Sequence, residues 1–589
     1  MSGGTRHTIR FGNLDREAAC GEGETVFQSA RRSGIRIVGA CGGRGVCGTC
    51  MVRVTSGEFE LPGAEKSRNP RKWLRACQVH PRGDCVVEVA PRSLARVVRA
   101  EVDGKGAASL AFDPVVKARD LTLSAPTLSQ GGADADRVLE NLVEAGMASI
   151  DLYALRELPT LLRENGWSVR TAWRGDEVIA IAPPGRRTLG LAVDLGTTNC
   201  AGYLLDLGSG KQLAGIGMEN PQGSYGADLV SRMNYAIGSA GQQSELRSAA
   251  VTAVSELART LCEAVGERPE DVVEIAVCGN TAMHHLLLGL PVRQLGRAPY
   301  VPAVCESLDV KARDLGFACA PGAYAHLMPN VGGYVGGDHV AALIATESRW
   351  SDATTVVMDI GTNTEISLIH KGAIRTVSCP SGPALEGGHI SCGMRAAEGA
   401  IERVSLEDGA IVTKTIGGKH PVGLCGSGVL DAIAVLVEAG IVERSGRLNA
   451  KHPAVRERDG HKEALIAPGV ALSQGDVRSV QLAKAAIRAG IDVLLAEAGL
   501  DEARIERVVI AGAFGTYIRV ESAMAIGLLP KLPLERFEQV GNAAGLGVRM
   551  VLASGGARKH ACTIARRCRY LELGSVPGFQ KTFLSRIGL

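Results

Sequence analysis

The same short turn occurs twice in this chain, and this repeat restricts the possible folds more than any other feature. The first copy lies in residues 189–208, LGLAVDLGTTNCAGYLLDLG, and the second in residues 355–370, TVVMDIGTNTEISLIH. Asp194 aligns with Asp359, 165 positions later. In each copy an apolar strand leads into a D-x-G-T turn and a second strand. Two copies about one domain length apart predict two turns that face each other across one cleft.

The chemistry of this turn suits a phosphate group and a metal ion. Glycine at the tip lets the backbone approach a phosphate, and threonine hydroxyls and backbone N–H groups donate to its oxygens. An aspartate at the end of a strand can hold Mg²⁺ through water. One such turn is weak evidence, because a strand–turn–strand needs glycine for steric reasons alone. Two facing turns predict a cleft for a nucleoside triphosphate.

A third segment, residues 508–519 (VVIAGAFGTYIR), reads as a strand, a glycine turn and then a helix. Such a turn can pack against an adenosine group, although alone it also fits a plain strand–helix connection. Together the three segments resemble the two phosphate turns and the adenosine turn of the acetate and sugar kinase, heat-shock chaperone and actin superfamily. The resemblance implies two α/β lobes that close on ATP and Mg²⁺.

A dense cysteine group lies near the N-terminus. Cys41, Cys47 and Cys50 have the spacing C-x5-C-x2-C within the glycine-rich run CGGRGVCGTC, and Cys77 follows. Four thiolates are what a [2Fe–2S] cluster requires. A zinc site is the alternative, but zinc sites usually use paired C-x2-C units and this region has one. We interpret most of the other twelve cysteines as packing residues. Cys562 and Cys568 lie close in sequence, but two thiols cannot hold a cluster without further ligands.

The residues around these cysteines predict a small α+β domain. We expect strands at residues 7–11, 51–55 and 85–90. A capping box at Thr25 and Gln28 predicts a helix that continues to Arg32. This order resembles a plant- or adrenodoxin-type [2Fe–2S] ferredoxin of the β-grasp fold, although the cysteine loop is one residue longer than the plant-type spacing.

Charge separates this region from the rest of the chain. Residues 1–92 hold 15 Lys and Arg against 9 Asp and Glu, a net charge of +6, whereas the whole chain has +3. Several of these cations surround Cys77 in sequence: Lys66, Arg68, Arg71, Lys72, Arg75 and Arg82. They fit either a solvated basic face or a docking face for an acidic redox partner. The near-neutral total and the 4% of aromatic residues argue against nucleic acid and membrane as partners.

We therefore expect a multidomain α/β and α+β protein. The predicted units are a ferredoxin-like domain (1–92), a linker (93–112), a small α/β middle domain (113–186) and a two-lobed actin- or hexokinase-like ATPase domain (187–589), with lobes at about 187–350 and 351–589. In the middle domain we expect helices at 138–145 and 152–165, and strands at 167–173 and 177–182. The polar N-terminus and the lack of a long apolar stretch favour a cytoplasmic protein.

Several residues of the ATPase domain carry weaker signals. Asp338 stands at the start of a predicted helix, where capping is favoured over a catalytic role. Residues 423–429, GLCGSGV, form a glycine turn suited to an anion at a helix start. We interpret His284 and His285 as packed and hydrogen-bonded residues rather than ligands.

Two glycine-rich stretches complete this group. One contains Glu386, and the other is residues 541–548, GNAAGLGV. Both can line the cleft or a partner surface.

The combination resembles the reductive activators of corrinoid proteins over nearly the whole chain. The matching runs include CGGRGVCGTC, VDLGTT, MDIGTNTE, GNTAMHHLLLG, GLCGSG, GAFG and GNAAG. The resemblance implies a [2Fe–2S] cluster that reduces Co(II) to Co(I) in a corrinoid protein of a methyltransferase system, driven by ATP and Mg²⁺. It also implies an upstream electron donor. The absence of extra C-terminal ferredoxin cysteines favours the bacterial branch, and kinase-like lobes of this class often form homodimers.

The resemblance also implies roles for individual residues. The cluster ligands are Cys41, Cys47, Cys50 and Cys77. Asp194 and Asp359 are the expected catalytic residues at the cation. The expected contacts to the nucleotide are Gly196, Thr197, Thr198, Gly361, Thr362, Asn363, Gly512 and Gly515.

Two other functions remain open at this stage. The chain could be an ATP-driven electron donor to another low-potential enzyme, as dehydratase activators are, although those bind a [4Fe–4S] cluster between subunits. It could also be an ATP-binding chaperone or scaffold with a sensory cluster. The second alternative predicts ATP binding without reduction of cobalt.

Overall fold

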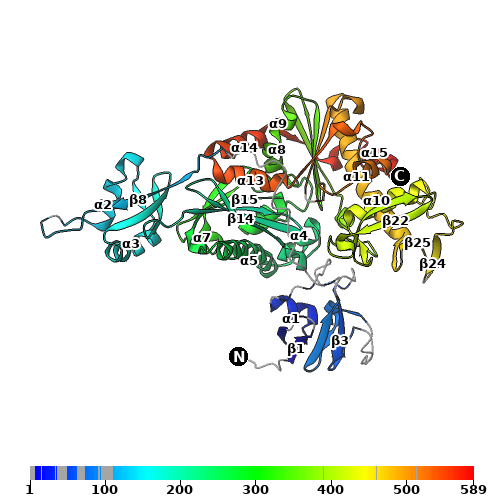
Figure 1. Ribbon diagram of the computed structural model, residues 1–589, viewed down its shortest axis with the longest axis horizontal. Coiled ribbons are helices and arrows are strands. Elements are labelled where there is room, and N and C mark those ends of the chain that lie inside the picture. The colour runs from blue at the N-terminus through cyan, green and yellow to red at the C-terminus, as the bar shows by residue number, and fades with distance from the viewer. Residues whose placement is uncertain are drawn as a thin grey trace.

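The computed structural model shows several units along the chain (Figure 1). It describes residues 7–12, 14, 16–33, 35, 37, 45, 50–62, 73–90, 93, 111–129, 131–388, 390–458, 460–512 and 514–589. Predictions for Cys41, Cys47 and most of the linker 93–112 lie outside these residues. Among the helices described, none is long and apolar enough to span a bilayer.

The N-terminal unit, which we call the head, is a five-stranded sheet in the order β2-β1-β7-β3-β5. Its elements are β1 (His7–Phe11), β2 (Arg16–Cys20), α1 (Val26–Arg32), β3 (Met51–Ser56), β4 (Phe59–Glu60), β5 (Leu74–Arg75), β6 (His80–Pro81) and β7 (Cys85–Val89). The expected strands and helix are confirmed. Thr25 and Gln28 form the predicted capping box at the start of α1. Alternating side chains such as Ile9 and Phe11 are buried between the sheet and α1.

The next unit packs two helices on a four-stranded sheet in the order β8-β10-β11-β9. It consists of β8 (Val116–Thr122), α2 (Asp134–Glu140), β9 (Ser149–Ile150), α3 (Leu152–Glu164), β10 (Ser168–Arg174) and β11 (Glu177–Ala182). Three predicted elements are confirmed, but the helix expected at 138–145 begins and ends earlier. Asp134 and Asp136 stabilise its first turn, and the Asn141 side chain donates to the Arg137 carbonyl at its end.

The first phosphate turn belongs to a six-stranded sheet in the order β14-β13-β12-β15-β17-β16. The strands are β12 (Leu189–Leu195), β13 (Asn199–Asp206), β14 (Gln212–Glu219), β15 (Val272–Gly279), β16 (Leu308–Lys311) and β17 (Tyr324–Leu327). The helices are α4 (Leu229–Gly238), α5 (Ala240–Ala264), α6 (Thr281–Leu288), α7 (Ala312–Leu315), α8 (Gly337–Ala345) and α9 (Glu347–Trp350).

The second turn belongs to another six-stranded sheet, in the order β28-β27-β18-β19-β20-β29. Its strands are β18 (Thr355–Ile360), β19 (Thr364–His370), β20 (Ala373–Cys379), β27 (Arg507–Ala511), β28 (Phe537–Gly541) and β29 (Cys568–Tyr570). Two three-stranded sheets accompany it, made of β21 (Ala400–Glu407), β22 (Ala410–Thr415), β23 (Gly423–Leu424), β24 (Val455–Arg458), β25 (His461–Ala467) and β26 (Val470–Ser473). The helices are α10 (Gly426–Glu438), α11 (Gln474–Ala498), α12 (Val520–Ala525), α13 (Ala543–Ala553), α14 (Gly555–Arg567) and α15 (Phe579–Ser585).

The internal repeat is confirmed in the strand pairing of these two sheets. In the first, β12 pairs antiparallel with β13 and parallel with β15. In the second, β18 pairs antiparallel with β19 and parallel with β27. Asp194 and Asp359 therefore occupy equivalent places near the ends of β12 and β18.

Helix α13 returns from the second sheet to the first. It packs on β12, β15 and α8, although it follows β28 in sequence. The approach to α8 is close, because a Cβ atom at Gly547 would lie 2.1 Å from the Ala341 carbonyl oxygen. This packing joins the C-terminal part of the chain to the sheet that carries the first turn.

We predict that Gly547→Ala lowers the free energy of unfolding of the ATPase domain by about 2 kcal/mol, because the added methyl group must displace backbone atoms. Gly556→Ala on α14 is the matched control, since its nearest neighbour is the Ser554 hydroxyl at 3.4 Å. Urea unfolding followed by circular dichroism measures both. Equal stability of the two variants would show that the α8–α13 contact is not tight.

Candidate functional site

The two phosphate turns meet in the structure. The hydroxyl oxygens of Thr198 and Thr362 lie 2.7 Å apart. Asn220, at the end of β14, donates from its side chain to the Gly196 carbonyl at 2.8 Å and from its backbone to the Thr198 carbonyl at 2.9 Å. The second turn closes through a Gly361 N–H that donates to the Asn363 carbonyl at 3.1 Å. The facing arrangement expected from the repeat is thus present.

Three carboxylates gather where the turns meet. Loss of hydration raises the pKa of Asp194 to about 6. It raises the pKa of Asp359 to about 8, with repulsion from Asp338 and Asp194 as further causes. The pKa of Asp338 is also raised, by burial first and by the charge of Asp194. All three carboxylates are thus poorly solvated, and repulsion between them contributes to the raised pKa values of Asp338 and Asp359.

Asp338 was expected to cap the start of a helix, but it is not the N-cap of α8. The N-cap of α8 is Gly336, and Asp338 is the second residue inside the helix. Its Oδ1 accepts from the His339 backbone at 2.8 Å, which satisfies one of the open N–H groups of the first turn. The side chain therefore belongs to the acidic group at the turns as well as to the helix start. An acidic residue in a first helical turn looks the same in sequence whichever role it has.

Asn542 belongs to the glycine-rich stretch 541–548, which was expected to line the cleft or a partner surface, but the sequence assigned this residue no role of its own. This residue is the N-cap of α13, and its Oδ1 accepts from the Gly545 N–H at 2.7 Å. Its side-chain amide donates to Asp194 Oδ2 and to the Tyr203 hydroxyl oxygen, both at 3.2 Å. An Asn between a strand and an apolar helix is a recognisable cap signal. The contact with Asp194 requires the return of α13 to the first sheet, which no local pattern predicts.

Glu386, in the short 3-10 turn Pro383–Glu386, lies against the second phosphate turn. Thr362 donates its hydroxyl to Glu386 Oε1 at 2.8 Å. Burial raises the pKa of Glu386, while hydrogen bonds from Thr362 and Thr198 oppose this rise. Glu365, opposite Asp359 across the β18–β19 pair, also has a strongly raised pKa because of burial and repulsion from Asp338 and Asp359.

The third segment has the expected order of strand, glycine turn and helix, but the turn is longer than the sequence indicates. Residues 514–517 form turns, and α12 begins at Val520. The Gln539 side chain donates to the Gly515 carbonyl at 2.6 Å and to the Ile518 carbonyl at 2.9 Å, so these groups are engaged outside a helix. Gly512 has a φ of +92°, and a Cβ there would lie 2.5 Å from the Ile360 carbonyl oxygen. A glycine is therefore required where this turn meets the end of β18.

The glycine turn at residues 423–429 serves close packing. A Cβ atom at Gly426 would lie 2.1 Å from the Leu385 carbonyl oxygen and 2.6 Å from the Phe514 ring, and one at Gly428 would lie 2.1 Å from the Ile401 carbonyl oxygen. The first turn of α10 is thus packed closely against Leu385, Phe514 and Ile401.

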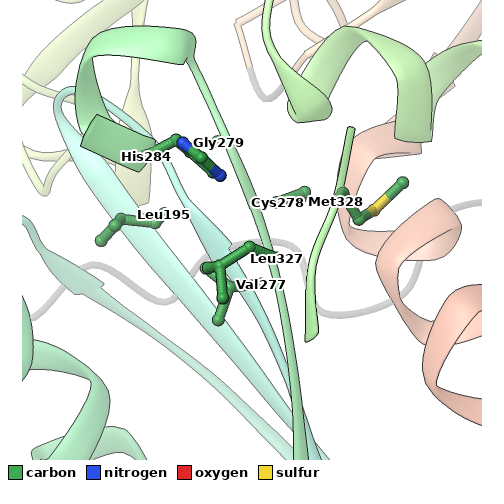
Figure 2. A pocket seen from close by; sticks show the side chains of 7 residues that line it. All are labelled: Leu195, Val277, Cys278, Gly279, His284, Leu327 and Met328. Carbon is green, nitrogen blue, oxygen red and sulfur yellow. The ribbon is translucent and has the colours of Figure 1, made fainter. Parts of the chain in front are cut away.

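A small apolar pocket lies behind the first turn (Figure 2). It is lined by Leu195, Val277, Cys278, Gly279, His284, Leu327 and Met328. His284 is buried, and loss of hydration together with His285 lowers its pKa to about 3, so it is neutral. The two nitrogens of the His285 ring contact the Thr281 carbonyl and the Ala303 N–H, both at 2.8 Å. Both histidines are packed in the protein interior, as expected, although His284 Nε2 has no hydrogen-bond partner among the described residues.

Two of the four proposed cluster cysteines come together in the head. The Sγ atoms of Cys50 and Cys77 lie 3.4 Å apart in the buried part of the domain, well beyond the length of a disulfide bond. Cys50 and Cys77 are distant in sequence, and thiols that converge in this way fit two ligands of one iron–sulfur cluster. Cys41 and Cys47 lie outside the described residues. Cys20 and Cys85 are buried in the core, as expected of packing residues.

The predicted basic face is described only in part. Arg82 pairs with Glu60, and Arg75 donates to the Gly45 carbonyl. The other four cations around Cys77 lie outside the described residues. The docking interpretation of this face stays a prediction.

Comparison with known proteins finds similarity along the whole chain. Successive parts match the 2Fe-2S iron-sulfur cluster binding domain (residues 11–82), the RACo linker region (105–188), the RACo middle region (189–349) and the C-terminal domain of RACo, the ASKHA domain (353–589). These matches confirm the predicted fold class, a cluster-binding head joined to an actin-like ATPase. The exact domain boundaries stay predictions.

Individual relatives agree with these matches. The corrinoid activation enzyme RamQ of Eubacterium limosum is 30% identical over 598 residues, which cover 98% of each chain. The Co(II) methylated amine-specific corrinoid protein reductase of Methanosarcina barkeri is 26% identical over 374 residues, covering 58% of this chain and 66% of that protein. A solved structure of a reductive activator for corrinoid, iron-sulfur protein is 32% identical with a TM-score of 0.74, covering 99% of this chain and 98% of that one.

The raised pKa values predict how stability depends on pH in the presence of a chelator. A group whose pKa is higher in the folded protein contributes stability at low pH and loses it as the pH rises through the folded value. The free energy of unfolding should therefore fall between pH 6 and 8, by up to about 1.4 kcal/mol per pH unit for each titrating group. Urea unfolding at pH 6, 7 and 8 measures this slope.

Asp359→Asn should flatten the slope, because it removes the group whose pKa is about 8. Asp352→Asn is the matched control, since Asp352 is an exposed residue that pairs with Arg507. A slope that Asp359→Asn leaves unchanged would contradict the electrostatic description of the site.

Proposed function

The chain belongs to the RACo family, and from this premise we propose that it reactivates a corrinoid protein of a methyltransferase system by an ATP-dependent, one-electron reduction of Co(II) to Co(I). The observation that carries the proposal is the presence in one chain of a cluster-binding head and two phosphate turns in contact through Thr198 and Thr362. Neither an ATPase nor a ferredoxin needs the other unit for its own chemistry. The combination fits a protein that uses nucleotide binding to drive electron transfer.

The residues of the cleft fit a nucleotide with Mg²⁺. Among the described residues no three acidic, histidine or cysteine side chains converge closely enough to ligate a metal directly. We propose that Asp194, Asp338 and Asp359 hold Mg²⁺ through water, as hard carboxylate oxygens around this ion often do. The cation would relieve the repulsion that raises their pKa values.

Other residues would position the phosphates and the base. Thr197, Thr198, Thr362 and Asn363 would donate to phosphate oxygens, and Gly196 and Gly361 would let the backbone approach them. Gly512 and Gly515 would lie near the adenosine. Asn542 would orient Asp194 through the hydrogen bond of its side-chain amide.

Cys41, Cys47, Cys50 and Cys77 would hold the [2Fe–2S] cluster. When bound, this cluster supplies single electrons of low potential, near −400 mV for the plant type. Co(I) is a very strong reductant, so reduction of Co(II) is uphill, by about 1.4 kcal/mol for each 59 mV of the one-electron gap. The two lobes can be open or closed. ATP can offset this cost only if the open and closed arrangements differ in their affinity for the nucleotide and for the partner.

The partner that follows from this proposal is a corrinoid protein in its Co(II) state. The Methanosarcina barkeri relative is, by its name, a reductase of a methylated amine-specific corrinoid protein. The net charge of +6 on residues 1–92 favours an acidic surface on the partner or on the upstream electron donor.

The direct test mixes the reduced protein with a Co(II) corrinoid protein and follows the Co(I) absorbance with and without Mg-ATP. We expect Co(I) only with Mg-ATP. Asp359→Ala should lower both ATP hydrolysis and Co(I) formation at least tenfold, because the residue stands at the proposed cation. Asp352→Ala, at an exposed residue, should leave both rates unchanged.

The outcomes separate the candidate functions. No Co(I) from any plausible corrinoid partner, with the ATPase intact, would favour a chaperone or scaffold. Reduction of a different low-potential acceptor instead would favour an electron donor to another enzyme. Full ATP hydrolysis by Asp359→Ala would refute the proposed cation site.

A further inference from the structure

The head contacts the first lobe of the ATPase domain through Arg31, in the last turn of α1. The Arg31 guanidinium carbon lies 4.3 Å from the centre of the Tyr225 ring. One guanidinium nitrogen lies 3.6 Å from Glu245 Oε2. A cation thus faces both an aromatic ring and a carboxylate of another unit.

The receiving surface is assembled by the first lobe itself. Tyr225 follows the short 3-10 turn Pro221–Ser224, Tyr235 lies on α4, and Glu245 lies on α5. The Tyr235 hydroxyl donates to Glu245 Oε2 at 2.6 Å, and the Tyr225 and Tyr235 ring centres are 5.2 Å apart. We call these three residues the Tyr–Glu cradle. Its own contacts orient the ring and the carboxylate that Arg31 meets.

The Tyr–Glu cradle is connected to the first phosphate turn by a short segment. Asn220 holds the Gly196 and Thr198 carbonyls at one end of this segment. Asn220 Oδ1 also accepts from Gln222 N at 2.9 Å, and Tyr225 N donates to the Gln222 carbonyl at 2.9 Å. Two hydrogen bonds, one between Asn220 and Gln222 and one between Gln222 and Tyr225, therefore connect the phosphate turn to the ring under Arg31.

The far side of this segment is also anchored. Arg232 on α4 is almost completely buried, and its Nε donates to the Gly226 carbonyl at 2.8 Å. Gln222 is buried as well, and its side-chain amide donates to the Leu246 carbonyl on α5 at 2.9 Å. Buried hydrogen bonds thus anchor the segment between Asn220 and Tyr225 to α4 and α5.

We propose that the Tyr–Glu cradle is an intramolecular docking site for the head, occupied by Arg31, and that the state of the first phosphate turn changes its affinity for Arg31. The second half of this statement rests on the proposed nucleotide site, whereas the first half does not. Coupling of this kind is reciprocal, so docking of the head also changes the affinity of the site for the nucleotide.

The exposure of the contact suits a reversible docking. Arg31 is 23% exposed and Glu245 is 48% exposed at the side chain. Exposed ion pairs and cation–π contacts of this type shift an equilibrium by about tenfold or less each. Docked and released heads can therefore interconvert, and added salt weakens the ion pair.

Small-angle X-ray scattering of the full-length holoprotein tests the docking site. Arg31→Ala and Glu245→Gln should each lower the docking equilibrium by about threefold to tenfold, which increases the radius of gyration. The matched controls are Arg82→Ala, an exposed head arginine, and Glu256→Gln, which lies on α5 beside Arg259. Both controls should keep the wild-type scattering curve. Cluster absorbance verifies that each variant head is folded.

A second measurement protects against a misfolded variant. The exchanged pair Arg31→Glu with Glu245→Arg should recover part of the compact state, which neither single charge reversal should do. Scattering curves of Arg31→Ala and Glu245→Gln that match the wild type, with intact clusters, would overturn the docking site.

The proposed coupling between the first phosphate turn and docking of the head has its own test. Mg-ATP should change the docked fraction of the wild-type protein, and Asn220→Ala should abolish this response because it cuts the segment at the phosphate turn. Nucleotide binding is measured separately by calorimetry. A wild-type protein that binds Mg-ATP with no change in scattering would overturn the coupling, while the docking result would stand. Neither experiment contains cobalt, so failure here is distinguishable from failure of the reductive activity.

Discussion

The burial of like charges near the two turns is the constraint on which the proposed nucleotide site depends. Asp194, Asp338 and Asp359 come from three different elements, and their charges lie close enough to repel one another. Folding brings them together although each disfavours the others, and the tight glycine turns and the return of α13 keep them there. Such an arrangement is costly unless a cation is part of the working state. We propose that the nucleotide–Mg²⁺ complex supplies the charge that offsets this repulsion.

The same contacts connect the lobes. Thr198 of the first turn touches Thr362 of the second, and Thr362 in turn donates to Glu386. Asn542, which follows the second sheet in sequence, holds Asp194 of the first. Any change in charge at this point alters contacts on both sheets at once. In our proposal, a nucleotide bound here changes the relation between the lobes, and through Asn220 it changes the segment beside the head.

The features that sequence predicted correctly are those whose cause is local. The hairpins around Asp194 and Asp359 follow from apolar runs and a glycine turn, and α1 begins at its capping box. The features it missed depend on distant parts of the chain. Asp338 joins the acidic group only because α8 packs beside β15, and Asn542 reaches Asp194 only because α13 crosses back. The turn after β27 is held outside a helix by Gln539, a residue of the next strand.

The central claim is that the electron reaching cobalt comes from the cluster in the head, under the control of ATP. Electron paramagnetic resonance of a stoichiometric mixture, with the cluster reduced and excess reductant removed, tests it most directly. We expect Mg-ATP to remove the reduced-cluster signal and the Co(II) signal in equal amounts, and Cys47→Ser to abolish both changes. Loss of the Co(II) signal while the reduced-cluster signal persists would contradict the account.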